Sequence, residues 1–370
     1  MIQKNLHERV YLFLESLKKK DNNYFYNPML NGLTKHGKSL NLGFSTYALK
    51  IFFIYGYWDE LSKNEKTKWI NNINSFQTCI SNLPNNSYVD TALYNFYISP
   101  PNSKILKNNL KRIYSKISSQ NFISLENQLL NAVRAETKQS ISTLHQVGYL
   151  NNKKYSNFAK SNSEINKFLE SFNWEFPWSA GANFSSLCVF SKTQLDHDNF
   201  LRNRDSLMNY IKLKANSETG GYYSKKTPSN NEIINGSMKV ITGLDWLDEE
   251  IHYPKKLIDF CLSTKPNSNG CDIVDIIYVL FKCSELTNHR KKEIFEYFKD
   301  LSEIIFSHYF SSFGAFSYYK NKSQQYYNGV VISKGQKTPD LHGTLLLSWG
   351  LSMIEVFSEN NIDKWNIIKP

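Results

Sequence analysis

The sequence has few of the features that mark common enzyme and membrane-protein classes. It contains no P-loop, no glycine-rich dinucleotide motif, no HExxH and no GxSxG pattern, so we expect no nucleotide or nicotinamide cofactor. The strongest apolar run, residues 47–58, is short and carries Lys50, which predicts no membrane span. Five cysteines without a CxxC pair, and no secretion-signal pattern at the amino terminus, favour a reducing, cytoplasmic location without disulfides.

Acidic residues are scarce relative to basic ones, at 33 against 44, which gives a formal net charge of +11. The basic residues are scattered and form no long block. We interpret them as a solvated basic surface and expect no nucleic-acid partner, because a nucleic-acid site would need a clustered stripe. A length of 370 residues suits either two domains or one large repeat fold with a single core.

Alternation of apolar and polar residues, the pattern of β-strands, is rare, and most apolar residues recur at helical spacing. Glycines, prolines and asparagine clusters separate these helical segments. We therefore predict an essentially all-α chain, with under about a tenth of its residues in strands. The helices are expected at residues 1–20, 44–57, 69–80, 91–98, 105–117, 125–147, 165–172, 201–213, 234–244, 255–262, 271–281, 291–310 and 341–354.

A short frame of residues recurs in the second half of the chain. In its last copy, residues 341–351, His342 precedes a glycine and a run of apolar residues. Asn235 and Asp272 occupy the same first place in two earlier copies. Three helices are thus expected to begin with a polar residue and to continue as a buried run.

Glu136 and Gly181 extend this series toward the amino terminus as further candidate helix starts. The intervals between the starts suit one helical hairpin each, and repeated hairpins form either an open solenoid or a closed ring. The start helices are unusually apolar, which favours an inner layer covered by an outer one. We predict a single domain over residues 1–370, an α/α toroid, with the best repeat signal in 130–355 and an irregular helical part in 1–125.

Several segments resemble the terpenoid cyclase and protein prenyltransferase fold. Residues 220–244 combine a Gly-Gly turn, a loop and an inner helix as the repeats of that fold do, and residues 338–354 resemble the segment with its zinc-binding histidine. The resemblance places that histidine on His342 and the zinc aspartate on Asp275. It implies an α/α toroid, a shape shared with six-hairpin glycosidases and toroid polysaccharide lyases. The zinc cysteine of the family corresponds to Ile277, so we expect no bound metal.

Equivalent helix starts of a toroid would fall on one rim and point inward. We therefore predict that His342, Asp272 and Asn235 meet at one cavity mouth, with Asn235 binding substrate. His342, Asp272, Asp275 and Glu136 are the catalytic candidates, because their side chains suit acid–base chemistry. Each has a structural alternative: helix capping for Asn235 and Asp272, a buried ion pair for Asp275, and a solvated helix face for Glu136.

Five further residues are candidates for substrate binding. Lys239 lies one turn into its helix and is placed to reach an anion, although a surface lysine is the alternative. Trp178 offers an aromatic face to a sugar ring or an isoprenoid chain, with core packing as its alternative. Asn183 follows the same Pro-Trp segment, and Tyr222 and Tyr223 carry hydroxyl groups beside the Gly-Gly turn.

These residues favour an enzyme that acts on a carbohydrate, in surface-glycan or oligosaccharide processing. As a lyase, His342 would remove a proton while Lys239 or an asparagine neutralises a uronate carboxylate. As a hydrolase, Asp272 or Asp275 would pair with Glu136.

Two alternatives stay open. The first is an enzyme with an isoprenoid substrate, as the resemblance implies, although the acid motif of the cyclases would have Val274 at its proton donor. The second is a non-catalytic scaffold or glycan-binding module. In each enzymatic case the expected partner is a small molecule or an oligosaccharide.

Overall fold

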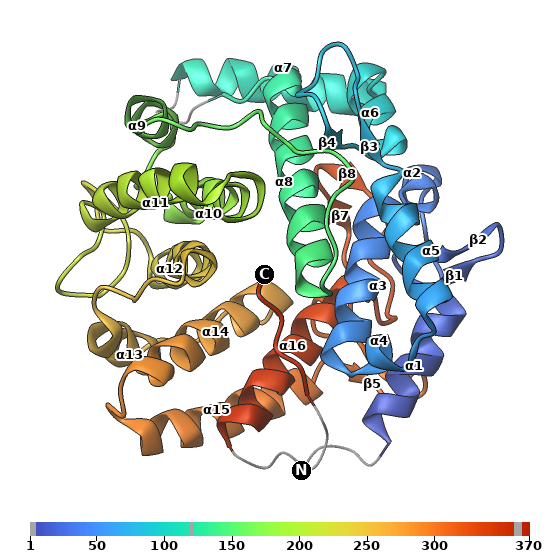
Figure 1. Ribbon diagram of the computed structural model, residues 1–370. Helices are drawn as coiled ribbons and strands as arrows, with labels where there is room; N and C mark the ends of the chain where they lie inside the picture. Colours follow the sequence, from blue (N-terminus) through green and yellow to red (C-terminus); the bar gives the residue numbers. More distant parts are fainter. Residues whose placement is uncertain (1–4, 118–121, 359–364) are drawn as a thin grey trace.

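The computed structural model describes residues 5–117, 122–358 and 365–370 (Figure 1). Within these residues it contains sixteen helices, and its eight strands are only two to five residues long. The prediction of an all-α chain with very few strands is therefore confirmed.

Six helices occupy the centre of the molecule, and we call them the central helices. They are α3 (Leu42–Ile54), α8 (Leu125–Gln146), α10 (Pro177–Gln194), α12 (Asn230–Leu247), α14 (Gly270–Leu286) and α16 (Leu341–Phe357). α10 packs against α8 and α12, α14 packs against α12 and α16, and α3 packs against α16 and α8. Figure 1 shows these helices arranged around the C-terminal residue.

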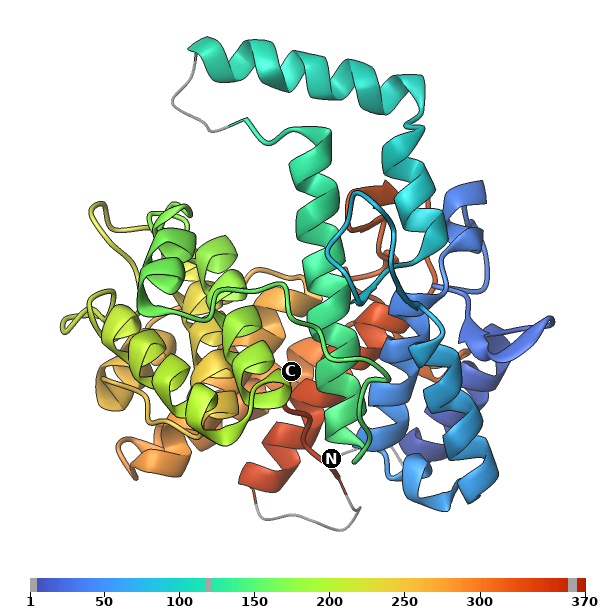
Figure 2. The same ribbon diagram turned by 45° about the horizontal axis from the view of Figure 1, so that its top comes forward.

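The remaining helices lie mostly outside the central ones. α11 packs on α10, α13 packs on α14, α15 packs on α14 and α16, and α4 and α5 pack on α3. Their bounds are α1 (Leu6–Leu17), α2 (Lys35–Ser39), α4 (Tyr57–Glu60), α5 (Lys63–Asn74), α6 (Thr91–Ile98), α7 (Asn102–Ile117), α9 (Asn162–Glu170), α11 (His197–Lys212), α13 (Pro254–Leu262) and α15 (Lys291–Phe306). Figure 2 shows α7 projecting from the rest of the molecule.

The strands form four separate two-stranded antiparallel hairpins. They are β1 (Lys18–Lys19) with β2 (Asn22–Tyr26), β3 (Gln77–Thr78) with β4 (Ser87–Tyr88), β5 (Tyr309–Phe310) with β6 (Ala315–Phe316), and β7 (Tyr326–Tyr327) with β8 (Val330–Val331). The last two hairpins lie between α15 and α16. The helix expected at residues 291–310 stops at Phe306, and the β5–β6 hairpin begins at Tyr309.

Burial separates the central helices from the outer ones. α3, α12, α14 and α16 bury most of their residues on all sides, whereas α11 and α15 bury one face only. A helix that is apolar all round must be covered all round, and an amphipathic helix supplies that cover. This is the inner and outer layering that the apolar repeat segments predict.

The central helices run in the same direction. Pro177, the first residue of α10, packs against Gly236 near the start of α12. At the other end, the ammonium group of Lys192 lies 2.6 Å from the carboxylate of Asp248, which follows α12. The side-chain contacts of the pairs α12–α14 and α3–α16 show the same direction. In each pair, one contact joins residues nearer the amino-terminal ends of both helices, and another joins residues further along both helices. The amino-terminal ends of the helices therefore gather at one end of the molecule.

The last described segment covers the opposite end. The backbone N–H of Asn366 donates to a carbonyl at the end of α3 (2.9 Å), and that of Lys369 donates to the side chain of Gln146 at the end of α8 (2.6 Å). The indole of Trp246, at the end of α12, donates to the oxygen of Pro370 (3.0 Å). This segment thus ties together the carboxyl-terminal ends of three central helices.

We predict that Gly343→Ala destabilises the protein. A Cβ atom at Gly343 would lie 2.2 Å from the backbone nitrogen of Tyr318, and backbone cannot move as easily as a side-chain tip. The expected loss is about 1–3 kcal/mol of unfolding free energy, measured by chemical or thermal denaturation.

The matched control is Gly350→Ala on the same helix. There the nearest neighbours of the new methyl group are side-chain tips, of Ile277 and Ile305 at 3.2 Å and of Val274 at 3.8 Å, and alanine favours a helix over glycine. Equal losses for both variants would contradict the close approach at Gly343.

Candidate functional site

The predicted helix starts lie inside helices, not at their caps. The capping residues of α12, α14 and α16 are Ser229, Asn269 and Asp340, whose side-chain oxygens accept from backbone N–H groups of the first turn. The capping interpretation of Asn235 and Asp272 is therefore wrong. The repeat frame marked the first buried turn of each helix, and the caps precede it because polar caps lie outside the apolar run.

Asn235 and Asp272 nevertheless meet, as the frame predicts. The amide of Asn235 donates to Oδ1 of Asp272 across 2.7 Å. Oδ2 of the same carboxylate accepts from the amides of Asn267 (2.6 Å) and Asn269 (2.9 Å). With three amide donors, Asp272 is held as a well-satisfied carboxylate that joins α12 to α14.

Asp340 fixes the loop that covers the start of α16. Its carboxylate accepts from the backbone N–H groups of Gly343 (2.7 Å), Tyr318 (2.8 Å) and Gln324 (3.0 Å). Burial raises its pKa to about 6, against the effect of these hydrogen bonds. The result is that Tyr318 is held beside the first turn of α16.

His342 lies in that first turn, between two aromatic rings. Its imidazole stacks on Tyr47 of α3, with centroids 4.8 Å apart, and on Tyr318, at 5.3 Å. Nδ1 has no hydrogen-bond partner among the described residues. Burial, with the positive charges of Lys239 and Lys50, lowers the pKa of His342 to about 3. The imidazole is therefore neutral at physiological pH and has a free ring nitrogen.

Asp275 faces the same region from α14. It is 1% exposed, and its Oδ2 has no hydrogen-bond partner within the described ranges. Burial raises its pKa to about 7, although the charge of Lys239 opposes the rise. A carboxyl group that titrates near neutral pH can both donate and accept a proton, which is the property expected of a general acid or base.

Three lysines surround these groups: Lys50 on α3, Lys138 on α8 and Lys239 on α12. Burial, and then the charge of Lys239, lower the pKa of Lys50 to about 8. Burial also lowers the pKa of Lys138 well below its usual value, with contributions from Lys50 and Lys239. Such mutual effects require the three ammonium groups to lie near one another. In the described part of the chain, none of them makes a hydrogen bond or an ion pair.

Glu136 lies at the edge of this region, and its expected alternative, a solvated helix face, is wrong. The side chain is 2% exposed. It accepts from the hydroxyl of Tyr327 (3.1 Å) and from the backbone N–H of Asp90 (3.2 Å). Burial, and then the charge of Asp90, raise its pKa well above the usual value. Glu136 thus links α8 to the β7–β8 hairpin as a group with a strong preference for the protonated form.

Four predicted substrate-binding residues lie elsewhere. Asn183 accepts from the guanidinium of Arg134 (2.8 Å), and Trp178 is 47% exposed at the start of α10. Tyr222 is fully buried with its hydroxyl 3.2 Å from a histidine ring nitrogen, and Tyr223 is buried beside it. No contact joins these four to His342 among the described residues. Their role in binding stays a prediction.

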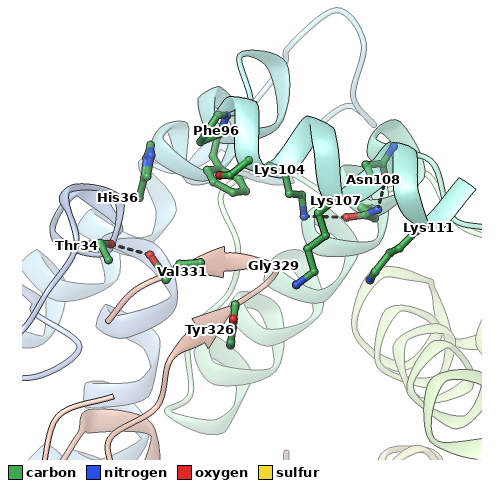
Figure 3. A pocket seen from close by; sticks show the side chains of 13 residues that line it. Thr34, His36, Phe96, Lys104, Lys107, Asn108, Lys111, Tyr326, Gly329 and Val331 are labelled. Atoms are coloured by element: carbon green, nitrogen blue, oxygen red, sulfur yellow. Dashed lines mark hydrogen bonds between the residues drawn. The ribbon is translucent and has the colours of Figure 1, made fainter. Parts of the chain in front are cut away.

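A separate pocket of about 550 Å³ lies beside α7 (Figure 3). Lys104, Lys107 and Lys111 line it, with Tyr326 on the opposite side. Lys104 donates to the side chain of Gln128 (2.9 Å), and Lys107 lies 5.9 Å from the centre of the Tyr326 ring. The pocket is basic, and it faces α7 and the β7–β8 hairpin, not the interior of the central helices.

The described residues contain no group of three histidine, cysteine, aspartate or glutamate side chains able to hold a metal ion. Each described helix is too short or too polar to span a membrane. The chain matches no known protein family, no curated protein and no solved structure.

Sequence reasoning missed Lys138 and Tyr47 as site residues, and it noted Lys50 only as an interruption of an apolar run. That interruption was the available signal, because a lysine within a buried helix is costly unless it has a function. Sequence reasoning expected the tyrosine-rich loop with Tyr318 at the cavity mouth but not the stacking of Tyr318 on His342. Tyr318 carries no such signal, since its position depends on a loop that a distant aspartate holds.

Asp275→Asn is predicted to change the pH dependence of stability. The folded-state pKa of Asp275 is about 7, above its ordinary value near 4, so the native state binds this proton more tightly. Its contribution to stability is therefore present below about pH 4 and is lost as the pH rises toward 7, by about 1.4 kcal/mol per pH unit at most. The variant should gain stability relative to the wild type between pH 5 and pH 8.

The measurement is urea denaturation of both proteins at several pH values. A difference between variant and wild type that does not change with pH would show that Asp275 is ionised throughout.

Proposed function

We propose that the central and outer helices form a closed α/α toroid. The contacts of the central helices support this proposal, because they follow the order α3, α8, α10, α12, α14, α16 and then return to α3. Shared direction and outer amphipathic helices are also expected of that fold. The segment at the carboxyl-terminal ends would close one side, so that a ligand enters from the side of Asn235 and Asp272.

We propose further that the toroid is an enzyme that acts on an acidic carbohydrate. The observation that supports this proposal is that the charge of Lys239 acts on both His342, a neutral imidazole, and Asp275, a carboxyl group whose pKa is raised to about 7. Together with the amides around Asp272, they make the centre polar, which favours a saccharide over an isoprenoid chain.

The arrangement suits the elimination reaction of a uronate-containing saccharide. Lys239 would neutralise the uronate carboxylate, which makes the adjacent C–H bond more acidic. His342 would take this proton, and the substrate carboxylate would raise the low pKa of the imidazole as it binds. Asp275 in its protonated form would give a proton to the departing glycosidic oxygen as the C–O bond breaks and the C=C bond forms.

Hydrolysis is the second candidate, because Glu136 and Asp275 are both buried carboxyl groups with raised pKa values. One of the two would have to be ionised to activate water or attack the sugar. The elimination is favoured because Glu136 is already bound by Tyr327 and strongly prefers its proton.

The test is incubation of the purified protein with a panel of uronate-containing oligosaccharides. Elimination creates a product with a new double bond, detected by ultraviolet absorbance and by an unchanged summed mass of the fragments. Hydrolysis adds one water to that sum. No product from any acidic oligosaccharide would contradict the proposal.

If a substrate is found, His342→Ala should lower kcat at least about 100-fold, the usual effect of losing a general base. Unfolding measured in parallel should show a modest change, since the imidazole makes no hydrogen bond through Nδ1. His197→Ala, on the exposed face of α11, is the matched control and should leave kcat unchanged. Equal kcat values for both variants would exclude His342 as the base.

A further inference from the structure

Lys50, Lys138 and Lys239 extend from different central helices into one region. Figure 1 shows α3 and α12, which carry Lys50 and Lys239, on opposite sides of the C-terminal residue. The charge of Lys239 nevertheless lowers the pKa of Lys50. Two lysines on opposite helices act on each other in this way only if both side chains point toward the interior.

Among the described residues, no acidic side chain fully balances the positive charge there. Besides one another, the titratable groups that interact with these lysines are His342, the Cys188 thiol beside Lys138, and the Cys271 thiol and Asp275 carboxyl beside Lys239. Burial raises the pKa of Cys188 well above its usual value and that of Cys271 to about 11, so both thiols stay neutral. Burial raises the pKa of Asp275 to about 7, so the carboxyl offers at most part of a negative charge.

The three lysines lie among the central helices and are largely withdrawn from solvent. Lys50 is 7% exposed, and Lys138 and Lys239 are half-buried.

We propose that Lys50, Lys138 and Lys239 form a binding site for a multivalent oxyanion, that is, a phosphate, diphosphate or sulfate group. Unpaired ammonium groups are costly to bury, and an anion between them removes that cost. A tetrahedral oxyanion offers several acceptor oxygens to three donors, where a single carboxylate offers two.

The inference goes beyond the proposed function, because binding of the ion requires no turnover. If the proposed function is also correct, the oxyanion would be part of the substrate. A saccharide would then carry a sulfate or phosphate ester as well as its uronate.

Binding should be linked to proton uptake. The free protein holds Lys138 with a pKa well below its usual value and Lys50 with a pKa of about 8, because burial and like charges oppose protonation. An anion between them favours all three charged forms. Affinity should therefore fall as the pH rises through 8, and calorimetric heats should differ between buffers of different ionisation enthalpy.

The first experiment measures the melting temperature with sodium diphosphate, phosphate and sulfate, against sodium chloride and acetate at equal ionic strength. We expect a saturable rise with at least one of the multivalent ions and none with acetate. A preference for diphosphate or phosphate indicates a phosphorylated ligand, and a preference for sulfate indicates a sulfated one. No rise beyond that with chloride would overturn the proposal.

The second experiment compares Lys50→Met and Lys138→Met with the wild type. Each variant replaces a charged group among the central helices by an apolar side chain of similar length. Each should melt at a higher temperature than the wild type without the ion, and each should lose more than half of the ion-induced rise. Lys111→Met, in the basic pocket beside α7, is the matched control. Its melting temperature without the ion and its ion-induced rise should both equal those of the wild type.

Two outcomes would contradict the central site. Loss of the rise in Lys111→Met alone would place the ion in the pocket beside α7. A lower melting temperature of Lys50→Met together with an unchanged rise would make the lysines structural.

A third measurement uses the wild type alone, in case a variant fails to fold. Lysine acetylation is followed by mass spectrometry with and without diphosphate. Protection of Lys50, Lys138 and Lys239, with unchanged labelling of Lys111, is expected. Equal acetylation of these three residues with and without diphosphate would refute the site. A bound ion without any saccharide turnover would refute the proposed enzyme and leave the anion site standing.

Discussion

Uncompensated positive charge inside the bundle is the constraint on which the rest of the site depends. Three lysines of α3, α8 and α12 lie near one another without a carboxylate partner among the described residues. Burial, together with the charges of Lys239 and Lys50, lowers the pKa of His342 and keeps it neutral, and the charge of Lys239 opposes the rise in the pKa of Asp275. His342, Asp275 and the lysines are therefore electrostatically coupled through Lys239, whose charge also lowers the pKa of Lys50 and Lys138.

The fold holds this unit in place with contacts outside it. Asp340 binds the loop that places Tyr318 on His342, and Asp272 joins α12 to α14 through Asn235. Asp90 joins the start of α3 to α8. Its carboxylate accepts from the N–H groups at the start of α3, and its own backbone N–H donates to Glu136 of α8. These carboxylates are satisfied by hydrogen bonds. Asp275, whose Oδ2 has no partner among the described residues, differs from them in that respect.

Much of the helical layout could be predicted from the sequence, because burial imposes periodic apolar patterns. The helices expected at residues 91–98 and 125–147 agree with α6 and α8 to within one residue. α10 was predicted only through Gly181 as a candidate helix start, without bounds, since its buried residues lie on all sides and leave no periodic apolar pattern. The helix expected at residues 44–57 ends earlier, because Gly56 adopts a positive φ of 78° that breaks it into α3 and α4.

The site was partly predictable for a related reason. A polar residue inside an apolar helix is visible in a sequence, which is how Asp275, Lys239 and His342 were found. Which of these residues face one another depends on how distant helices pack, and no local pattern contains that information. Tyr222 illustrates the limit: it lies beside a Gly-Gly turn as expected, but its side chain is fully buried against a histidine.

The same charges bear on the non-catalytic alternative. A scaffold needs only a stable bundle, and methionine in place of Lys50 would give the core a side chain of similar length without the cost of desolvating a charge. A lysine that is 7% exposed and has a pKa of about 8 makes the empty protein less stable than it need be. Such a cost is expected where a ligand supplies the missing charge, because binding to the folded state returns the lost stability. The burial of Lys50 is therefore a reason to propose a ligand-binding protein in preference to a scaffold.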